Sequence, residues 1–265
     1  MKPMLADKTV LLTGASSGIG YELAQLLGRQ GAHLALIARR KDRLEALQQK
    51  IKGEAAIFAG DISNPEFCQN VVALTVQKFG GLDIVINNAG QSMNALFVDT
   101  DLKVFHQLMQ VNYFGSLYIA KFAIPYLKKN KGSLIFISSV VGKRGFPTRS
   151  GYCASKFAVQ GLFESLRVEL QSHGIHVGII SPGYTDTEIR KTALTADGRS
   201  ADSEKSFVEK TAGKVMSAQE AAEQILQATL KKKREVILTS GGKLMVWLNN
   251  RMPSLVDKLI GRAVG

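Results

Sequence analysis

Short apolar runs alternate with longer amphipathic segments along almost the whole chain. Seven of the runs are rich in β-branched residues and apolar on both faces, which is typical of buried parallel strands. They cover residues 9–14, 33–39, 55–61, 82–90, 132–139, 176–183 and 235–241. The segments between them, such as residues 19–31 and 217–233, follow the helical period, and the second opens with Ser217 and Glu220 at capping-box spacing.

This alternation predicts an α/β fold, a Rossmann-like doubly wound parallel sheet of about seven strands with helices on both faces. No stretch rich in Pro, Gly or Ser interrupts it. We therefore expect a single domain over residues 1–240 and a C-terminal extension over residues 241–265. The stretch from Thr187 to Val215 is polar and irregular after a strand end, and it suits a lid over a site better than a core element.

The C-terminal extension is amphipathic. Its apolar residues recur at steps of three or four, with basic residues on the other side: Leu244, Trp247, Leu248, Met252, Leu255 and Leu259, against Lys243, Arg251, Lys258 and Arg262. Pro253 is expected to begin a second short helix, because proline fits a first helical turn. The segment fits an anionic membrane interface, and it also fits packing over a cleft or against a second subunit, which we favour.

Composition narrows the class of protein. The 265 residues are 45% apolar, enough for one full core. No apolar run approaches the roughly 18 to 20 residues that span a bilayer, and the first residues lack a signal-peptide core. Cys68 and Cys153 have no spacing typical of a metal site or a disulfide framework, so we expect both to serve in packing. These features favour a cytoplasmic protein that is soluble or peripherally bound to a membrane.

The formal charge of +12 raises the question of nucleic-acid binding. Residues 231–265 hold eight Lys or Arg against two acidic residues, which is half of the excess, and another basic cluster covers residues 39–43. Aromatic residues do not alternate with basic ones in either region, as a base-stacking surface would require. We therefore predict no nucleic-acid partner.

A glycine-rich turn, TGASSGIG at residues 13–20, follows the first strand and precedes a helix. Gly14 allows a tight turn, Gly18 allows backbone to approach a pyrophosphate, and Gly20 allows the helix to pack closely on the sheet. No Gly-Lys-Ser/Thr follows, so the turn is not a P-loop. Glycine-rich turns also simply end strands, but the position of this one predicts a dinucleotide site.

The end of the second strand carries Ala38, Arg39 and Arg40 where many dinucleotide sites have an acidic residue. A carboxylate there would repel a 2′-phosphate, whereas a guanidinium binds it through paired charged hydrogen bonds. The sequence therefore predicts NADP(H) as the cofactor. The alternative is that the two arginines only open a solvated helix. Asp61, after the third strand, is placed to contact adenine.

Tyr152 and Lys156 lie four residues apart in SGYCASKFAVQG, which has helical character. Four residues is close to one helical turn, so the phenol and the ammonium share a face. The spacing alone favours an ordinary surface pair. Only other motifs in the chain distinguish that interpretation from a functional site.

Six motifs supply the distinction: TGASSGIG, NNAG at 87–90, VN at 111–112, ISS at 137–139, YCASK at 152–156 and SPGYTDT at 181–187. Together, in this order, they resemble the single-domain short-chain dehydrogenase/reductases from about residue 7 to 240. The resemblance implies an NADP(H) site without metal, formed by Gly14, Ser16, Ser17, Gly18, Ile19, Gly20, Arg39, Arg40, Asp61, Ile62, Asn88, Ala89, Gly90, Tyr152, Lys156, Pro182, Gly183, Thr185 and Thr187. It also implies a homodimer or homotetramer.

The same resemblance implies a catalytic tetrad of Asn112, Ser139, Tyr152 and Lys156. Tyr152 would be the proton donor, Ser139 would hold the substrate oxygen, and Asn112 would distort its helix and keep a water in a relay to Lys156. Ser138 is the competing serine, and spacing favours Ser139. Tyrosine has a pKa near 10, and a positive charge about 4 Å away would lower it by two to three units, so we expect Lys156 to lower the Tyr152 pKa.

The predicted function is therefore NADP(H)-dependent reduction of a carbonyl, or oxidation of the matching secondary alcohol. The alternative is a non-catalytic NADPH-binding regulator of the same fold. The segments expected to border the site, residues 91–97, 141–149 and 187–215, offer Met93, Phe97, Phe146 and Tyr184. An apolar or bulky substrate would suit them, although such residues equally well pack a lid onto its scaffold.

Overall fold

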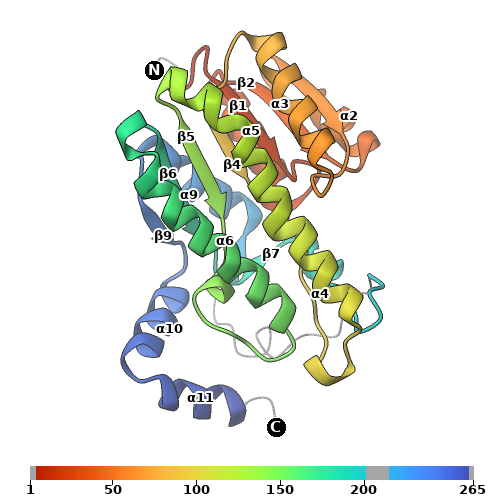
Figure 1. Cartoon of the computed structure of the whole chain (residues 1–265), viewed down its shortest axis with the longest axis vertical. Helices are drawn as coiled ribbons and strands as arrows, with labels where there is room; N and C mark the ends of the chain where they lie inside the picture. The colour runs from red at the N-terminus through yellow and green to blue at the C-terminus, as the bar shows by residue number, and fades with distance from the viewer. Residues whose placement is uncertain (1–3, 201–214, 263–265) are drawn as a thin grey trace.

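The computed structural model describes residues 4–200 and 215–262. Its main sheet has seven parallel strands in the order β3-β2-β1-β4-β5-β6-β9 (Figure 1). The strands are β1 Thr9–Thr13, β2 His33–Ala38, β3 Ala55–Ala59, β4 Ile84–Asn87, β5 Ser133–Ile137, β6 His176–Ser181 and β9 Glu235–Ile237. All seven lie within the predicted runs, so the prediction of a doubly wound parallel sheet is confirmed.

Helices cover both faces of this sheet. On one side pack α1 Gly18–Arg29, α2 Lys41–Gln48 and α9 Ala218–Leu230. On the other pack α3 Pro65–Phe79, α5 Gly115–Asn130 and α6 Ser150–Glu169, which lie in front of the strands in Figure 1. The remaining helices of the described residues are α4 Leu102–Leu108, α7 Glu188–Lys191, α10 Ser240–Arg251 and α11 Pro253–Arg262, with short turns η1 Phe97–Asp99, η2 Met109–Phe114, η3 Val140–Gly142 and η4 Gln171–His173.

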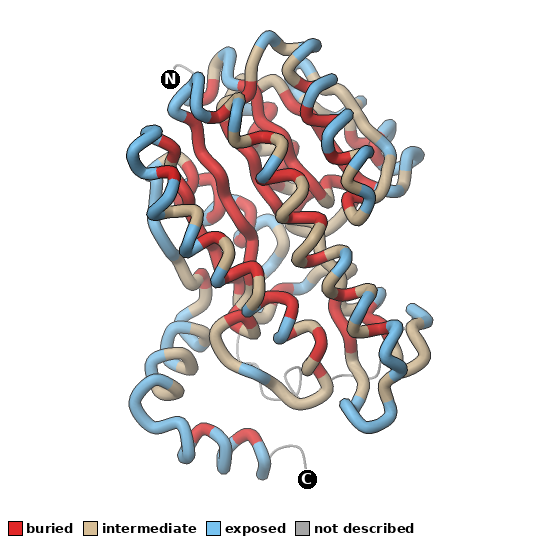
Figure 2. Tube along the Cα trace, viewed as in Figure 1, coloured by how far each residue is buried: buried red, intermediate tan, exposed pale blue. Residues whose placement is uncertain are grey.

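Two hydrophobic clusters hold the layers together. In β1, Leu12 belongs to the cluster under α1, α2 and α9, while its neighbour Leu11 belongs to the cluster under α3, α5 and α6. Each central strand is buried on both faces in this way, as the red strands between the helices show (Figure 2). Alternate residues of a strand point to opposite faces, so two covered faces require apolar residues at nearly every position.

The order of the strands reverses between β1 and β4, because β2 and β3 lie on one side of β1 and β5 and β6 lie beyond β4. In open parallel sheets a crevice forms at such a reversal, beyond the carboxyl ends of the strands. The loops that follow Thr13 and Asn87 meet there. The fold therefore places the glycine-rich turn and the NNAG loop at one crevice.

The last predicted strand, residues 235–241, is longer than the strand in the structure. β9 has only three residues, and α10 begins at Ser240, because the hydroxyl of Thr239 accepts a hydrogen bond from Gly242 N at 3.2 Å and caps the helix. Pro253 is the first residue of α11, as predicted. Both helices extend away from the sheet (Figure 1).

The stretch predicted as a lid contains regular pieces. It contains α7, and a small sheet just outside its two ends joins β7 Thr185–Asp186 to β8 Met216–Ser217. Ala193 and Leu194 are buried, so the segment is less polar in its packing than its composition suggests. Residues 201–214 of the predicted lid lie outside the described residues. Within the described part, no helix has the length and apolar character needed to cross a membrane.

Candidate active site

The glycine-rich turn is fixed by the loop after β4. Gly14 has φ of +70°, and a Cβ there would lie 2.8 Å from the Cα of Ala89. The Thr13 hydroxyl accepts hydrogen bonds from the N–H groups of Asn88 and Ala89, both at 3.0 Å. The Asn88 amide donates to the carbonyls of Thr13 and Gly14. Only glycine fits this turn, and Asn88 acts by holding it in place.

Gly20 has a different role from the other predicted glycines. A Cβ at Gly20 would lie 2.2 Å from the Gly14 carbonyl oxygen, so a side chain cannot fit between α1 and the turn. The residue is absent from the wall of the cavity described below. Gly20 therefore permits close packing of α1, as predicted. A cofactor contact was also predicted for Gly20, but this residue does not border the cavity.

A cavity of about 1290 Å³ occupies the crevice. Its wall contains every residue of the predicted cofactor site except Gly20: Gly14, Ser16, Ser17, Gly18, Ile19, Arg39, Arg40, Asp61, Ile62, Asn88, Ala89, Gly90, Tyr152, Lys156, Pro182, Gly183, Thr185 and Thr187. Ser17, the N-cap of the twelve-residue α1, makes no side-chain capping bond. Free N–H groups at a helix N-terminus bind anions, so this wall fits the pyrophosphate of a dinucleotide.

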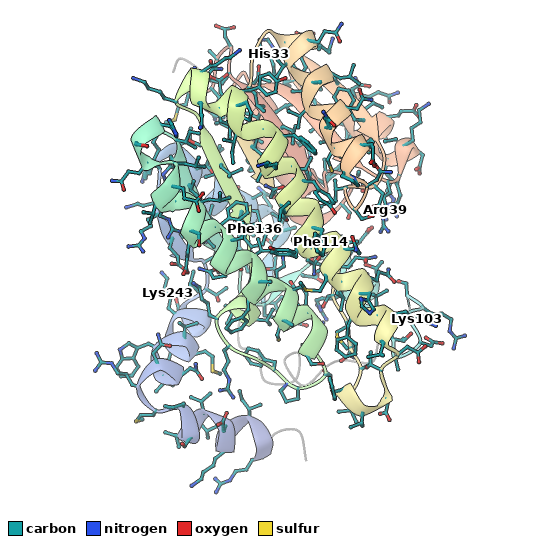
Figure 3. The ribbon with its side chains drawn as sticks, viewed as in Figure 1. His33, Arg39, Lys103, Phe114, Phe136 and Lys243 are labelled. Atoms are coloured by element: carbon teal, nitrogen blue, oxygen red, sulfur yellow. The ribbon has the colours of Figure 1, made fainter. Side chains whose placement is uncertain are left out.

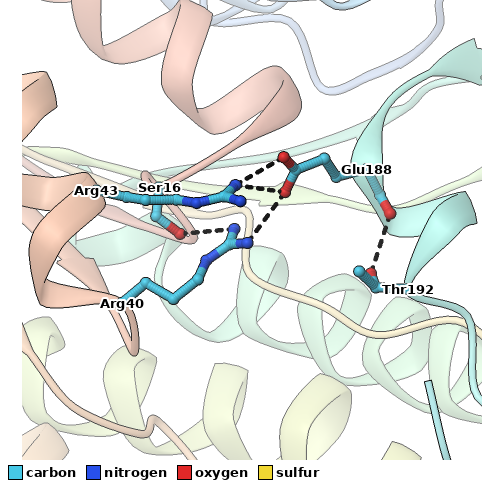
Figure 4. Close-up of polar contacts among 5 residues, drawn as sticks. All are labelled: Ser16, Arg40, Arg43, Glu188 and Thr192. Carbon is cyan, nitrogen blue, oxygen red and sulfur yellow. Dashed lines mark hydrogen bonds and ion pairs between the residues drawn. The ribbon is translucent and has the colours of Figure 1, made fainter.

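The basic end of the cavity contains an unexpected carboxylate. Arg40 donates to Ser16 Oγ at 3.2 Å and to Glu188 Oε2 at 3.1 Å, and Arg43 donates to both oxygens of Glu188 at 2.6 and 2.8 Å (Figure 4). Arg39 is exposed. The sequence analysis missed Glu188 and Arg43, because they are 145 residues apart and no local pattern connects them.

Asn112 lies in a π-helical turn, η2, between α4 and α5. The resemblance implied a distorted helix at this residue, and the structure has one. Its side chain is fully buried, accepts from Gln91 N at 2.8 Å, and donates to Gln91 O at 2.9 Å and to Ser155 Oγ at 2.8 Å. Asn112 lies behind the cavity wall and joins α6 to the loop after β4.

Ser139 and Tyr152 meet at the cavity wall. Ser139 is the N-cap of η3, where its hydroxyl accepts from Val141 N at 3.4 Å, and its side chain also interacts with the Tyr152 phenol and lowers the phenol pKa. Its neighbour Ser138 is buried, and its hydroxyl has no hydrogen-bond partner in the described structure. Both serines border the cavity, and Ser139 is the one whose side chain interacts with Tyr152.

Lys156 lies about one helical turn after Tyr152 on α6. Its ammonium group donates to Ile137 O at 3.1 Å and lies 4.8 Å from the centre of the Phe136 ring, which Figure 3 labels beside α6. Burial lowers the pKa of Lys156 to about 7. The lysine is therefore close to half-protonated at neutral pH.

The Tyr152 pKa differs from the prediction. Burial raises it to about 12, and the Ser139 hydrogen bond and the nearby charge of Arg149 lower it only in part. The prediction that Lys156 lowers the Tyr152 pKa is wrong for the protein without a cofactor. The Lys156 ammonium is directed at a backbone carbonyl and is itself desolvated. Arg149 is buried and donates to Ser92 Oγ at 2.6 Å, and the sequence analysis missed it.

The residues predicted to contact a substrate separate into two groups. Phe146 and Tyr184 border the cavity. Met93 is fully buried with Val104 and Leu108, and Phe97 is exposed and packs against Phe105, so neither borders it. The tail contributes Met245, Leu259 and Ile260 to the wall instead.

The two cysteines are buried and free, and Cys68 donates to Ile62 O at 3.1 Å. The described residues contain no group of three or more His, Cys, Asp or Glu that could hold a metal ion.

Comparison with known proteins adds an independent result. Residues 8–198 match a family model described as short chain dehydrogenase. Dehydrogenase/reductase SDR family member 7B of Bos taurus is 35% identical over 98% of this chain and 82% of its own length. The 11-beta-hydroxysteroid dehydrogenase-like 3 of Arabidopsis thaliana is 43% identical over 70% of this chain and 61% of its own.

Solved structures agree with these relatives. A dehydrogenase/reductase from Sinorhizobium meliloti 1021 superimposes with a TM-score of 0.80, at 28% identity, over 91% of this chain and 97% of that one. An alcohol dehydrogenase from the archaeon Thermococcus sibiricus, complexed with 5-hydroxy-NADP, has a TM-score of 0.73 at 27% identity, over 87% of this chain and 95% of that one.

Proposed function

The chain belongs to the short-chain dehydrogenase/reductase family of oxidoreductases, and on that premise we propose that it uses NADP(H) to reduce a carbonyl group, or to oxidise the matching secondary alcohol. The observation that carries the proposal is the pair of Tyr152 and Ser139, whose side chains interact on the wall of the cavity that also contains the predicted dinucleotide site. Two hydroxyl groups at that wall can both bind one carbonyl oxygen.

Each residue of the pair has a distinct role in the proposed reduction. NADPH would supply a hydride to the carbonyl carbon. Tyr152 gives its phenolic proton to the carbonyl oxygen, and its raised pKa keeps that proton in place throughout the neutral range. Ser139 donates a hydrogen bond to the same oxygen as negative charge develops.

Nearby positive charges stabilise the phenolate that remains after the transfer. Arg149 acts on Tyr152 in this direction, since its charge lowers the phenol pKa. Lys156, in its ammonium form, holds the ribose hydroxyls beside the reacting atoms, as the family resemblance implies. Because the Lys156 pKa is about 7, this form decreases as the pH rises above neutrality.

The choice of NADP(H) over NAD(H) is supported by the basic end of the cavity. Arg40 and Ser16 lie on the wall beside the glycine-rich turn and are hydrogen-bonded to each other. A guanidinium and a hydroxyl in this arrangement suit a 2′-phosphate on the adenosine ribose. The solved relative that holds 5-hydroxy-NADP supports the same choice.

The substrate class is supported by the outer part of the wall. Phe146 and Tyr184 border it from the main fold, and Met245, Leu259 and Ile260 border it from the tail. An apolar or bulky carbonyl compound would replace water against these side chains. The proposed substrate is therefore a hydrophobic ketone or aldehyde rather than a small polar one.

The outer face of the tail supports peripheral contact with a membrane. Leu244 and Trp247 are each 56% exposed and Leu255 is 43% exposed, while Lys243, Arg251, Lys258 and Arg262 lie on the same two helices. Two copies meeting through this face would bring like charges together, whereas anionic lipid would neutralise them. We propose that α10 and α11 rest on an anionic lipid surface, beside the cavity that an apolar substrate would enter.

Turnover on a carbonyl panel tests the proposal. The absorbance of NADPH would be followed with apolar ketones and aldehydes of increasing size, then with NADH in its place. We expect consumption of NADPH with the larger apolar compounds and little with NADH. Tight NADPH binding without turnover of any compound, in either direction, would favour the non-catalytic regulator.

A further inference from the structure

Glu188 is an acidic residue inside the basic end of the cavity. Its two carboxylate oxygens accept three hydrogen bonds, two from Arg43 and one from Arg40. The hydrogen bond from Arg43 is the main cause that lowers the pKa of Glu188, so the group is an anion at neutral pH. A carboxylate thus occupies the donors that a 2′-phosphate would need.

The same contact closes the cavity beside the glycine-rich turn. Glu188 is the first residue of α7, and the preceding Thr187 lies against the turn, since a Cβ at Gly18 would be 3.2 Å from Thr187 Cβ. Arg40 and Arg43 come from the start of α2, on the opposite side (Figure 4). The ion pairs therefore join α7 to α2 across the adenosine end of the cavity.

Both anions cannot use these donors together. Arg40 has one terminal nitrogen on Glu188 and the other on Ser16, so its paired donors are occupied. A phosphate bound there would be next to a carboxylate, and like charges at this distance repel. The side chains of Arg40, Arg43 and Glu188 are 39%, 42% and 38% exposed, and ion pairs exposed to this extent are weak enough to exchange.

We infer that Glu188 competes with the cofactor's 2′-phosphate for Arg40 and Arg43, and that binding of the phosphate releases α7 from α2. The inference rests on the proposed NADP(H) site and concerns a residue that no part of the proposed function uses. NADH, which has no 2′-phosphate, leaves the ion pairs intact, and the carboxylate can accept a hydrogen bond from its 2′-hydroxyl. Glu188 thus reduces the preference for NADPH.

Glu188→Gln tests the competition, because it keeps the shape of the side chain and removes the charge. We expect NADPH and adenosine 2′,5′-bisphosphate to bind about three- to tenfold more tightly to this variant, measured by calorimetry, while NADH and AMP change less than about twofold. Glu45→Gln is the matched control. It removes the same charge from α2, where Glu45 pairs with Lys41 at 3.6 Å, and should change neither cofactor.

Hydrogen exchange tests the release of α7. The N–H of Thr192 donates to the Glu188 carbonyl at 2.9 Å and reports on this helix. We expect NADPH, and not NADH, to speed exchange at Thr192 in the wild-type protein, and Glu188→Gln to exchange fast without cofactor. NADPH binding that is unchanged or weaker in Glu188→Gln would overturn the inference and make Glu188 an organiser of the arginines.

The wild-type protein separates this failure from failure of the proposed function. If it binds NADPH no better than NADH, and Arg40→Ala loses nothing, the proposed cofactor is wrong. If it prefers NADPH and depends on Arg40, but Glu188→Gln matches the wild type, only the competition is wrong.

Discussion

The side chain of Ser139 interacts with the phenol of Tyr152 and lowers its pKa, although thirteen residues and a change of element separate the two. Tyr152 lies in the first turn of α6, and Ser139 caps η3 just after β5. The fold therefore holds the proposed proton donor and the proposed oxygen-binding group in contact before any substrate arrives. This reduces the ordering that the reaction would require.

Replacing Tyr152 by Phe should remove the proton donor and leave the cavity intact. We expect kcat to fall by about 10² to 10⁴, with the Kd for NADPH, measured by calorimetry, within about twofold of the wild type. Tyr118→Phe is the control, because Tyr118 lies on α5 away from the cavity wall. A Phe variant at position 152 with wild-type turnover would show that another group donates the proton.

The low pKa of Lys156 should make stability depend on pH. The unfolded chain keeps this lysine protonated up to about pH 10.5, whereas the folded chain releases the proton near pH 7. The unfolded state therefore binds more protons between these values, and stability rises with pH by about 1.4 kcal/mol per unit from this group alone.

Urea unfolding of the wild type and of Lys156→Met between pH 7 and 9 measures the effect. The range ends at pH 9 because the raised pKa values of Cys68 and Cys153 act in the opposite sense above it. We expect the free energy of unfolding to rise more steeply in the wild type. Parallel curves for the two proteins would contradict the assignment of a lysine pKa near 7.

Removing Arg40 should weaken NADPH selectively. Loss of a hydrogen bond to a charged group costs about 1.5 to 3 kcal/mol, so we expect Arg40→Ala to weaken NADPH by that amount and NADH little. Arg39→Ala should have a smaller effect, because Arg39 is exposed whereas Arg40 contacts Ser16. Lys41→Ala controls for the general loss of positive charge. Equal losses for NADPH and NADH would contradict the 2′-phosphate assignment.

Truncation after Ser240 should affect the substrate more than the fold. The deleted helices supply Met245, Leu259 and Ile260 to the cavity wall, and Arg144 contacts them through Asn249 and Asp257. We expect a folded protein that binds NADPH, with a KM for apolar substrates raised about tenfold through lost apolar contacts. A truncated chain without cooperative thermal unfolding would show that the tail belongs to the core.

Sedimentation with liposomes tests the outer face of the tail. The full-length protein should bind vesicles that contain phosphatidylserine, less at high salt, and Trp247→Ala should reduce binding severalfold. Phe157→Ala removes an aromatic side chain of similar exposure from α6 and should change nothing. A tail variant that binds like the wild type but alters oligomer size in light scattering would favour a second subunit.

The fold was predictable because burial of a strand on both faces leaves a continuous apolar run that a sequence displays directly. Pro253 was predictable as a helix start for a similar local reason. The glycine-rich turn and the Tyr152–Lys156 pair were also predictable, since each lies in one short segment.

Features that depend on neighbours in the folded structure could not be predicted from the sequence. Glu188 contacts Arg43 only because the segments that follow β6 and β2 meet beyond the carboxyl ends of the strands. The raised pKa of Tyr152 depends on how deeply α6 packs, which spacing does not report. Met93 looked like a substrate contact by its place in the chain, but the fold turns it into a cluster with Val104 and Leu108.

The π turn around Asn112 is equivalent to one residue inserted into a long helix that runs from α4 to α5. Deletion of one residue between 109 and 114 would let that helix continue with regular α geometry, while α4 and α5 would keep the faces they now bury. Val104 and Leu108 would keep their contact with Met93, and the change would fall on the π turn that carries Asn112. The position of Asn112 is therefore set by the number of residues in this helix, and an alignment that places a gap there would mark a protein with a different site.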